Sequence, residues 1–444
     1  MESNEPKLEN TNENKKNNEN KNKESKKKNK KEQTKEQNKC ENKTNEIKKL
    51  QPSIYKYDEN SQIDYSTALE KYNLKLINPE NNFIKSQSKN FQFLINRNLL
   101  FAERNLDKLN ENKNFFILYE LFVSENTSLC LSEIIILNII KNIMQSNQKI
   151  HLIIQIADDE YLIETTGKFN FKQIKKFSEE KIENVLAILL DSDNKEYMNK
   201  NIHIFSNYFF RTFCHNFESL VSDFKMQVNY EKVVKLFNIT EDDSVGKLDY
   251  PCYIAMACNP NIYKEFISDI NENSICLIVN SIFFMNRYML CYDASKINNF
   301  NEPVLIALKI VNPLTGCNGY DCFFENNKEL TLLLEDNEKL LRKKIMKHSL
   351  SGARGSGTLE DHKKFGGNIE VDISCQYLKF LEENEEKLNE YLNKFGKGEL
   401  SCGEIKQILY EKLNELFNKI KDNKEKNINK ELVDSLKLEK ERKL

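Results

Sequence analysis

The 444-residue chain contains no tryptophan, only 7 prolines and only 12 glycines. Glycine makes up about 3% of the chain, less than half of the usual ~7%, and all twelve glycines lie at or after Gly167. Loops that wrap backbone amides around phosphate need glycine, because a Cβ would prevent the close approach. The first third of the chain therefore holds no glycine-rich phosphate loop and no dinucleotide fingerprint.

The cysteines and histidines of the chain lack the spacings of known metal-binding and redox motifs. The 11 cysteines include no C-x-x-C pair, and the 5 histidines form no H-E-x-x-H or zinc-finger pattern, so we expect no metal site. An odd number of cysteines without a secretory signal favours a reducing compartment. The most apolar run, 131–144, contains Glu133, Asn138 and Lys141 and is too polar to span a bilayer. We therefore expect a cytoplasmic protein that does not enter a membrane.

The first fifty residues differ from the rest of the chain. They contain 15 Lys, 10 Glu and no aromatic residue, for a net charge of +5, whereas the remaining 394 residues carry a net charge of −7. Such a segment cannot bury enough apolar surface to offset its ordering entropy, so we expect disorder over 1–50. This tail is either a low-complexity leader without a partner or a segment that binds a polyanion such as RNA by counterion release.

Short apolar runs alternate with amphipathic segments from Asn114 onward. The runs are near-continuous and rich in β-branched or aromatic residues, as expected for parallel strands covered on both faces: Phe115–Tyr119, Ile150–Ile156, Ile202–Phe205, Ser274–Val279 and Pro303–Val311. The segments between them have helical periodicity, and include Ser132–Met144, Lys172–Leu190 and Asn229–Phe237. This alternation predicts an α/β fold with a doubly wound parallel sheet.

The chain becomes helical after His348. Two apolar stripes recur at three- and four-residue steps, over 377–395 and 405–420, separated by Gly396 and Gly398. Stripes of this kind are more often packing faces than ligand sites. We therefore divide the chain into a disordered tail, an N-terminal helical extension, an α/β catalytic-type domain, an α-helical domain and a C-terminal helical tail, with the bounds 1–50, 51–112, 113–345, 346–425 and 426–444.

Several strings in this order resemble the eukaryotic and archaeal type of tryptophanyl-tRNA synthetase. They are Ile154–Leu162, Asp242–Lys247 with Tyr250 and Pro251, His348–Gly352, Thr358–His362 and Phe365–Asp372. The resemblance implies a class I Rossmann-like domain followed by an anticodon-binding helical domain, in a homodimer that activates tryptophan with ATP and transfers it to tRNA. Fold alone does not confer activity, so the site residues must be compared individually.

The resemblance also implies that both ATP signatures are degenerate. The family's H-x-G-H helix start, whose histidines bind phosphate, aligns with Cys130, Leu131, Ser132 and Glu133. Two glycines of the preceding turn align with Leu121 and Val123, and Glu133 would place a carboxylate near a triphosphate. The K-M-S-x-S loop should fall within Cys317–Lys328, which contains no such motif.

The amino-acid pocket is partly matched. Tyr119, Gln155 and Glu160 match family positions that engage tryptophan, although strand-end packing and helix capping explain them equally well. A stretch whose acid and glutamine bind the substrate's amino group aligns with Ile282–Asn286, where those two positions are Phe283 and Phe284. A buried ammonium without partners is strongly disfavoured, which argues against tryptophan binding.

The helical domain matches the family more closely. Arg354 and Lys363 are candidate contacts to tRNA phosphate, and Asp372 is a candidate acceptor from a base edge. The alternative is that Gly366 and Gly367 form a turn that holds helices together. We interpret His348 and His362 as packing or capping residues, because no nucleophile is paired with either.

Three functions are consistent with these observations. The first is a synthetase-like protein, catalytically impaired or inactive, that retains tRNA or protein binding and for which the sequence assigns no cofactor. The second is a functional but divergent tryptophan–tRNA ligase that uses ATP. The third is a scaffold held through the C-terminal stripes and the lysine-rich tail.

Overall fold

The computed structural model describes residues 64–438, except 112–113, 148, 166, 192–193, 317–320, 325–326 and 356–357. The tail expected over 1–50 lies outside the described residues. All of these residues belong to one compact unit of the chain.

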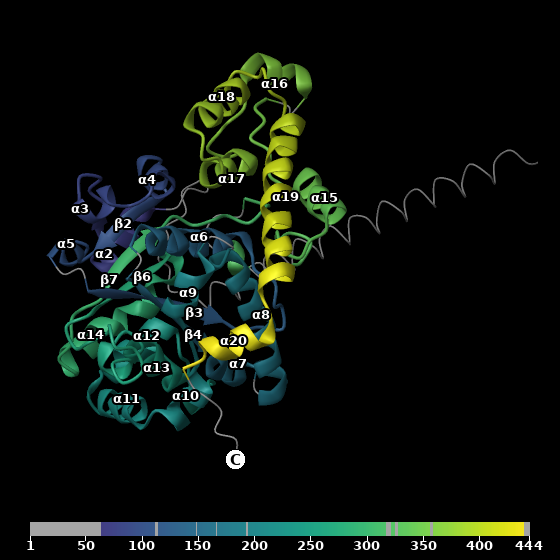
Figure 1. Cartoon of the computed structure of the whole chain (residues 1–444). Coiled ribbons are helices and arrows are strands. Elements are labelled where there is room, and N and C mark those ends of the chain that lie inside the picture. Colours follow the sequence, from purple (N-terminus) through teal and green to yellow (C-terminus); the bar gives the residue numbers. More distant parts are fainter. Residues whose placement is uncertain are drawn as a thin grey trace, which may run out of the picture. The chain divides into compact units, whose positions relative to one another are not determined.

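A seven-stranded sheet in the order β1-β2-β7-β6-β3-β4-β5 forms the centre of the α/β part (Figure 1). Five strands are parallel and two N-terminal strands pair antiparallel at the β7 edge. The strands are β1 (Lys75–Leu76), β2 (Leu100–Arg104), β3 (Phe115–Phe122), β4 (His151–Ala157), β5 (Ile202–Ser206), β6 (Ile275–Ser281) and β7 (Val304–Leu308). The five predicted strands are confirmed as β3 to β7, and the α/β fold is the predicted one.

Alternate residues of each parallel strand enter separate hydrophobic cores on the two faces of the sheet. On β3, Ile117 and Leu121 pack into one core, whereas Phe116 and Leu118 pack into the other. Because both faces are covered, every residue of β4, β6 and β7 is buried. This explains why the strands read as continuous apolar runs instead of alternating ones.

Helices cover both faces. The first core is completed by α6 (Leu131–Ser146) and α8 (Phe171–Leu189), and the second chiefly by α10 (Asn207–Phe213), α11 (His215–Gln227), α13 (Tyr250–Met256) and α14 (Met289–Ile297). The shorter elements are α7 (Asp158–Glu164), α9 (Lys195–Asn201), α12 (Tyr230–Phe237), η1 (Val245–Leu248), η2 (Pro260–Ile262), η3 (Ile282–Tyr288) and η4 (Cys322–Phe324). The predicted helices over 132–144, 172–190 and 229–237 are confirmed as α6, α8 and α12.

The segment before β3 contains strands as well as helices. Its helices are α2 (Tyr65–Tyr72), α3 (Asn82–Lys85), α4 (Lys89–Asn96) and α5 (Lys108–Glu111), and they accompany β1 and β2. The sequence analysis predicted only helices in this segment. β2 pairs with β7 and so extends the sheet beyond its parallel part.

The C-terminal part is helical. It comprises α15 (Glu338–His348), α16 (Leu359–Phe365), α17 (Ile373–Leu381), α18 (Glu385–Gly396), α19 (Cys402–Asn427) and α20 (Lys430–Leu436). Two helices, α17 and α18, divide the stripe over 377–395, and the long α19 carries the stripe over 405–420 along α15 and α8 (Figure 1). Beyond α20, the Leu438 amide donates to the Ile204 carbonyl at 2.8 Å, which covers the edge of β5.

Candidate functional site

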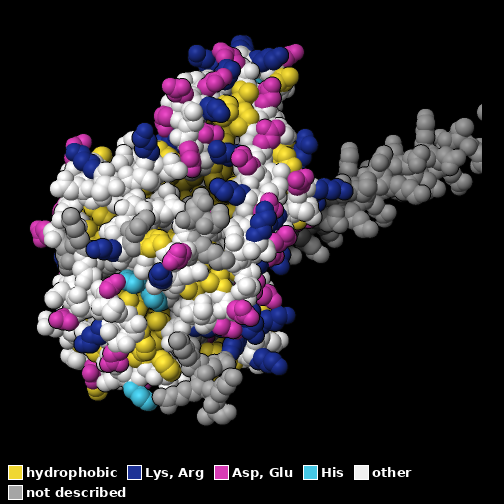
Figure 2. Space-filling model, in the orientation of Figure 1, with side chains coloured by type: hydrophobic (Ala, Val, Ile, Leu, Met, Phe, Trp, Pro, Cys, Tyr) yellow, Lys and Arg dark blue, Asp and Glu magenta, His cyan; other side chains and the backbone are white. Residues whose placement is uncertain are grey.

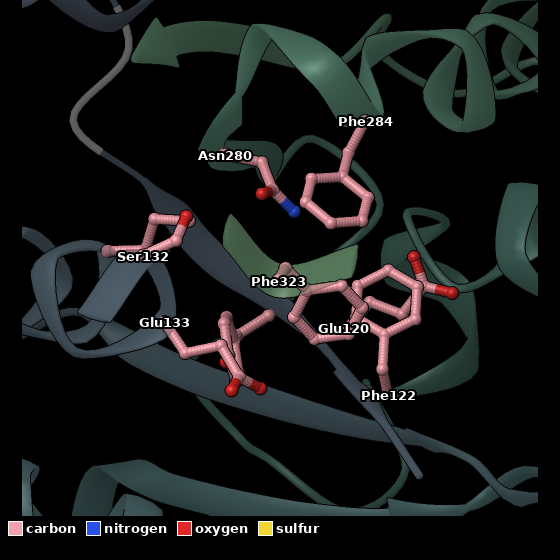
Figure 3. A pocket seen from close by; sticks show the side chains of 9 residues that line it. Glu120, Phe122, Ser132, Glu133, Asn280, Phe284 and Phe323 are labelled. Atoms are coloured by element: carbon pink, nitrogen blue, oxygen red, sulfur yellow. The ribbon is translucent and has the colours of Figure 1, made fainter. Parts of the chain in front are cut away.

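The order of the parallel strands reverses at β3, which has β4 and β5 on one side and β6 and β7 on the other. In open α/β sheets, ligands bind in the crevice at the carboxyl ends of the strands where this reversal occurs. A small cavity lies at this position and is lined by side chains from β3, α6, β6, η3 and η4 (Figure 3). The lining residues are Tyr119, Glu120, Phe122, Ser132, Glu133, Ile136, Asn280, Phe284 and Phe323.

Three phenylalanine rings from separate elements lie against one another at this cavity. The ring centroids of Phe122 and Phe284 are 5.0 Å apart, those of Phe122 and Phe323 are 5.1 Å apart, and those of Phe284 and Phe323 are 5.4 Å apart (Figure 3). We call these three side chains the phenylalanine cluster. The cavity that remains beside it has a volume of ≈ 10 Å³, which corresponds to roughly one water molecule. The cluster joins the end of β3 to η3 and to the stretch where the K-M-S-x-S loop was expected.

Cys130, Ser132 and Glu133 lie at the start of α6, beside this cavity. Glu133 caps the helix, because its Oε2 accepts from the Cys130 amide at 3.0 Å. Its Oε1 is 2.7 Å from the Lys181 Nζ, and the two side chains are only 7% and 3% exposed. The carboxylate that was expected to repel a triphosphate is therefore paired within the chain. Lys181 lies 48 positions further on, in α8, outside all of the motifs that the sequence analysis quotes.

The stretch Cys317–Lys328 contributes a second buried acid to the same end of the sheet, although 317–320 and 325–326 lie outside the described residues. The Asp321 carboxylate accepts from the Ser281 hydroxyl at 3.0 Å and from the Phe323 amide at 3.2 Å. Burial raises the pKa of Asp321 to about 6, against the lowering effect of these hydrogen bonds. These bonds anchor Phe323 beside the sheet.

The three predicted tryptophan-site residues have different environments. Tyr119 lines the cavity, and burial raises the pKa of its phenol. Gln155 is completely buried in β4, where its Nε2 donates to the Asn207 Oδ1 at 2.9 Å. Its Oε1 has no hydrogen-bond partner in the described part of the chain. Glu160, on α7, is engaged by Arg287.

Arg287 is a site residue that the sequence analysis missed. Its guanidinium binds Glu120 and Glu160 together, with Nη2 at 2.6 Å from the Glu120 Oε1 and 2.6 Å from the Glu160 Oε2. Nη1 adds a bond of 2.9 Å to the Glu160 Oε1. Glu120 follows Tyr119 directly, and Arg287 follows the stretch Ile282–Asn286, so both adjoin positions already singled out. Only the fold shows that they meet.

Two further acids lie at the start of α7. Burial raises the pKa of Asp158 to about 6 and that of Asp159 to about 7. The Asp159 Oδ1 accepts from the side-chain Nδ2 of Asn207 at 3.0 Å, and the Asp158 Oδ1 accepts from the backbone amide of Tyr208 at 3.1 Å. These bonds connect α7 to the start of α10.

The candidate tRNA contacts in the helical part differ in exposure. Asp372 is completely buried, and its oxygens accept from the backbone amides of Gly352 and Cys375 at 2.9 and 3.0 Å. This carboxylate caps α17 and holds a turn, which leaves no exposed oxygen for a base edge. Arg354 and Lys363 are exposed, and contact with tRNA stays a prediction for them. Figure 2 shows basic and acidic side chains interspersed over the visible face.

The glycine turn in the same part is tightly packed. A Cβ on Gly366 would lie 1.8 Å from the Gly396 carbonyl oxygen, and one on Gly367 would lie 2.2 Å from the Phe395 ring. His362 is buried there, with its Nε2 2.8 Å from the Leu400 carbonyl oxygen. The turn therefore holds α16 against the end of α18, as the structural interpretation of these glycines requires.

No group of three or more His, Cys, Asp or Glu side chains within residues 64–438, gaps excepted, is arranged to hold a metal ion. Among the helices that the structure describes, none combines the length and apolarity needed to cross a bilayer.

We compared the chain with known proteins by sequence and by structure. No family model matches the chain. The tryptophan–tRNA ligase of Encephalitozoon cuniculi is 25% identical over 356 residues, which is 78% of this chain and 86% of that protein. The ligase of Saccharolobus solfataricus is 26% identical over 365 residues, or 81% and 88% of the two chains.

Solved structures agree in fold. A tryptophanyl-tRNA synthetase homolog from Entamoeba histolytica superposes with a TM-score of 0.74 at 23% identity, and the match covers 85% of this chain and 97% of that one. The chain shares with these solved structures the class I aminoacyl-tRNA synthetase fold, in which a doubly wound sheet is followed by a helical part. Within this class, the chain is a divergent member of the tryptophanyl-tRNA synthetase family.

Proposed function

We propose that this is a tryptophanyl-tRNA synthetase-like protein whose tryptophan activation is impaired or lost and which retains a tRNA- or protein-binding role. The phenylalanine cluster is the observation that carries this proposal. It packs three apolar rings, contributed by three separate elements, into the switch-point crevice of the sheet.

The space at the crevice supports the proposal. Ligand pockets have volumes on the order of 300–1,000 Å³, whereas the cavity here has ≈ 10 Å³. To admit ATP, the three rings would have to separate and lose their mutual burial. Fully exposing one buried phenylalanine costs on the order of 1.5–3 kcal/mol, so opening the crevice would consume much of the binding free energy of a nucleotide.

The charges at the crevice support it as well. Transfer of a nucleotidyl group needs cationic groups or hydrogen-bond donors aimed at the developing negative charge. Lys181 is committed to Glu133 at 2.7 Å, and Asp321 adds a buried acid close by. We infer that the positions of the first ATP signature supply no free cation for pyrophosphate.

A functional, divergent tryptophan–tRNA ligase that uses ATP is the second candidate. It is favoured by the relatives, which are named as ligases, and by Tyr119, Gln155 and Glu160 at family positions. Exchange of pyrophosphate into ATP with tryptophan separates the two candidates. We expect the full chain to show only background exchange. Exchange well above background that Gln155→Ala abolishes and the exposed control Gln227→Ala preserves would establish the ligase and overturn our proposal.

We also propose that the protein is cytoplasmic and forms a homodimer. Several relatives are named as cytoplasmic ligases. A dimer is the state that the family resemblance implies, and sedimentation of the full chain tests it.

Binding to tRNA is a separate part of the proposal. Arg354 and Lys363 are exposed at the helical end of the molecule, where a phosphate can reach them. We expect each change to alanine to weaken tRNA binding and to lower the slope of log K against log salt by roughly one. Lys172→Ala, which removes an exposed lysine from the α/β part, is the matched control. If labelled tRNA does not bind even at low salt, a protein scaffold replaces this role.

A further inference from the structure

Arg287 binds two acids at the candidate site, and one of them, Glu120, lines the cavity. Besides the three short contacts described above, its Nε lies 3.3 Å from the Glu120 Oε2. The Arg287, Glu120 and Glu160 side chains are 12%, 0% and 16% exposed. The guanidinium thus uses both of its edges on carboxylates that come from β3 and α7.

Two aromatic rings flank the same guanidinium. The Arg287 Cζ lies 4.8 Å from the centroid of the Phe122 ring and 5.7 Å from that of the Phe237 ring. Cations are attracted to aromatic faces at these distances. Phe122 belongs to the phenylalanine cluster, so Arg287 also contacts the group that fills the crevice.

Glu120 is further held by the Tyr288 hydroxyl, which donates to its Oε2 at 3.2 Å, and the Asn280 Nδ2 donates to the Tyr288 Oη at 2.8 Å. Burial raises the pKa of Glu120, and Arg287 opposes this effect. An acid this deeply buried needs a cation or a proton. Arg287 supplies the cation from within the chain.

We propose that Arg287 is an intramolecular ligand that occupies the cation site formed by Glu120 and Glu160 at the candidate amino-acid pocket and closes this site to ligands that carry an ammonium group. The inference rests on the proposed loss of tryptophan activation and names the residue that excludes the substrate. Glu160 matches a family position that engages tryptophan, and here both of its oxygens bind the guanidinium. An incoming ammonium would have to displace a guanidinium held by two carboxylates and two rings.

The test removes the internal ligand and offers a soluble one. Arg287→Ala in the full chain leaves two carboxylates beside aromatic rings, and ethylguanidinium has the chemistry of the deleted group. We expect Arg287→Ala to bind ethylguanidinium at least about tenfold more tightly than the unmodified chain, measured by calorimetry at constant ionic strength. Arg97→Ala is the matched control, because Arg97 is also a buried, ion-paired arginine but pairs with Glu385 outside the pocket. Equal binding by all three proteins would overturn the inference.

The inference can still be tested if the Arg287→Ala variant fails to fold. If Arg287→Ala does not fold, millimolar ethylguanidinium should raise its refolding yield above that in sodium chloride of equal ionic strength. The double variant Glu120→Gln/Arg287→Ala, which carries one acid fewer, should fold and bind ethylguanidinium more tightly than the unmodified chain but less tightly than Arg287→Ala, because only the Glu160 carboxylate keeps its charge. Absence of both effects contradicts the inference. Pyrophosphate exchange by the unmodified chain tests the proposed function separately, so either idea can fail alone.

Discussion

The buried ion pair between Lys181 and Glu133 allows a quantitative test of how the crevice is stabilised. The Nζ and Oε1 atoms are 2.7 Å apart, and the side chains are 3% and 7% exposed. Replacing Lys181 with methionine retains most of the side-chain volume and removes the charge. Glu133 would then remain buried with only its capping bond to the Cys130 amide.

The expected loss of stability follows from the burial of both charges. Removing one partner of a buried pair costs about 3–5 kcal/mol, because the other charge is left uncompensated. The N-terminus of α6 offsets part of this cost, since an acid in the first turn of a helix gains roughly 0.3–1 kcal/mol. We therefore expect Lys181→Met to lower the free energy of unfolding by about 2–5 kcal/mol. Lys181→Met/Glu133→Gln should lie within about 1.5 kcal/mol of the unmodified chain, because no charge is left unpaired.

Urea unfolding of the full chain, followed by far-ultraviolet circular dichroism, measures this double-mutant cycle with Glu133→Gln as the other single variant. Lys200→Met, which breaks a pair whose side chains are 73% and 89% exposed, is the control and should cost less than about 1 kcal/mol. If the two single variants add without coupling, or if Lys181→Met is no worse than the control, the pair does not stabilise the crevice as argued.

Two further predictions concern pH and packing. Burial raises the pKa of Asp159 from 3.8 to about 7, so the folded chain retains a proton that the unfolded chain releases. This contribution to stability is therefore full below about pH 4 and is lost as the pH rises to about 7. Between pH 4.5 and pH 7.5, the urea midpoint should fall less for Asp159→Asn than for the unmodified chain. Equal falls in the two proteins would refute the raised pKa of Asp159. Gly367→Ala places a Cβ 2.2 Å from Phe395 and should destabilise by about 1–3 kcal/mol. Gly403→Ala, whose Cβ would lie 3.9 Å from the Ser401 Oγ, should not lower the melting temperature. Equal effects of the two changes would argue against close packing at Gly367.

The sequence predicted the parallel core of the sheet because that core has an unambiguous local signature. Strands buried on both faces must be apolar throughout, and β4, β6 and β7 are. The edge strands β1 and β2 lack this signature. β1 has only two residues, both exposed, and β2 continues into Glu103 and Arg104. Their pairing depends on contacts distant in the sequence, which no periodicity of a short segment shows.

The same limit applies to the candidate site. Family strings located Glu133, Phe284 and Glu160, but their partners lie far away along the chain. Lys181 approaches Glu133 from another helix, and Arg287 is 127 positions from Glu160. Nothing in the sequence around Lys181 or Arg287 distinguishes these residues from the chain's other cations. The spatial pairing of charges therefore had to come from the structure.

The unusual residues at the crevice occur in mutually compensating sets. Glu133 has Lys181, Glu120 and Glu160 share Arg287, and the phenylalanine cluster joins three elements. Simple loss of a catalytic site would leave buried charges and cavities, each of which costs stability. Instead, the chain satisfies these groups internally. Gln155 differs, because its Oε1 is buried without a partner in the described residues. The described side chains at the crevice are thus paired and packed as in a hydrophobic and ionic core, which stabilises this end of the sheet.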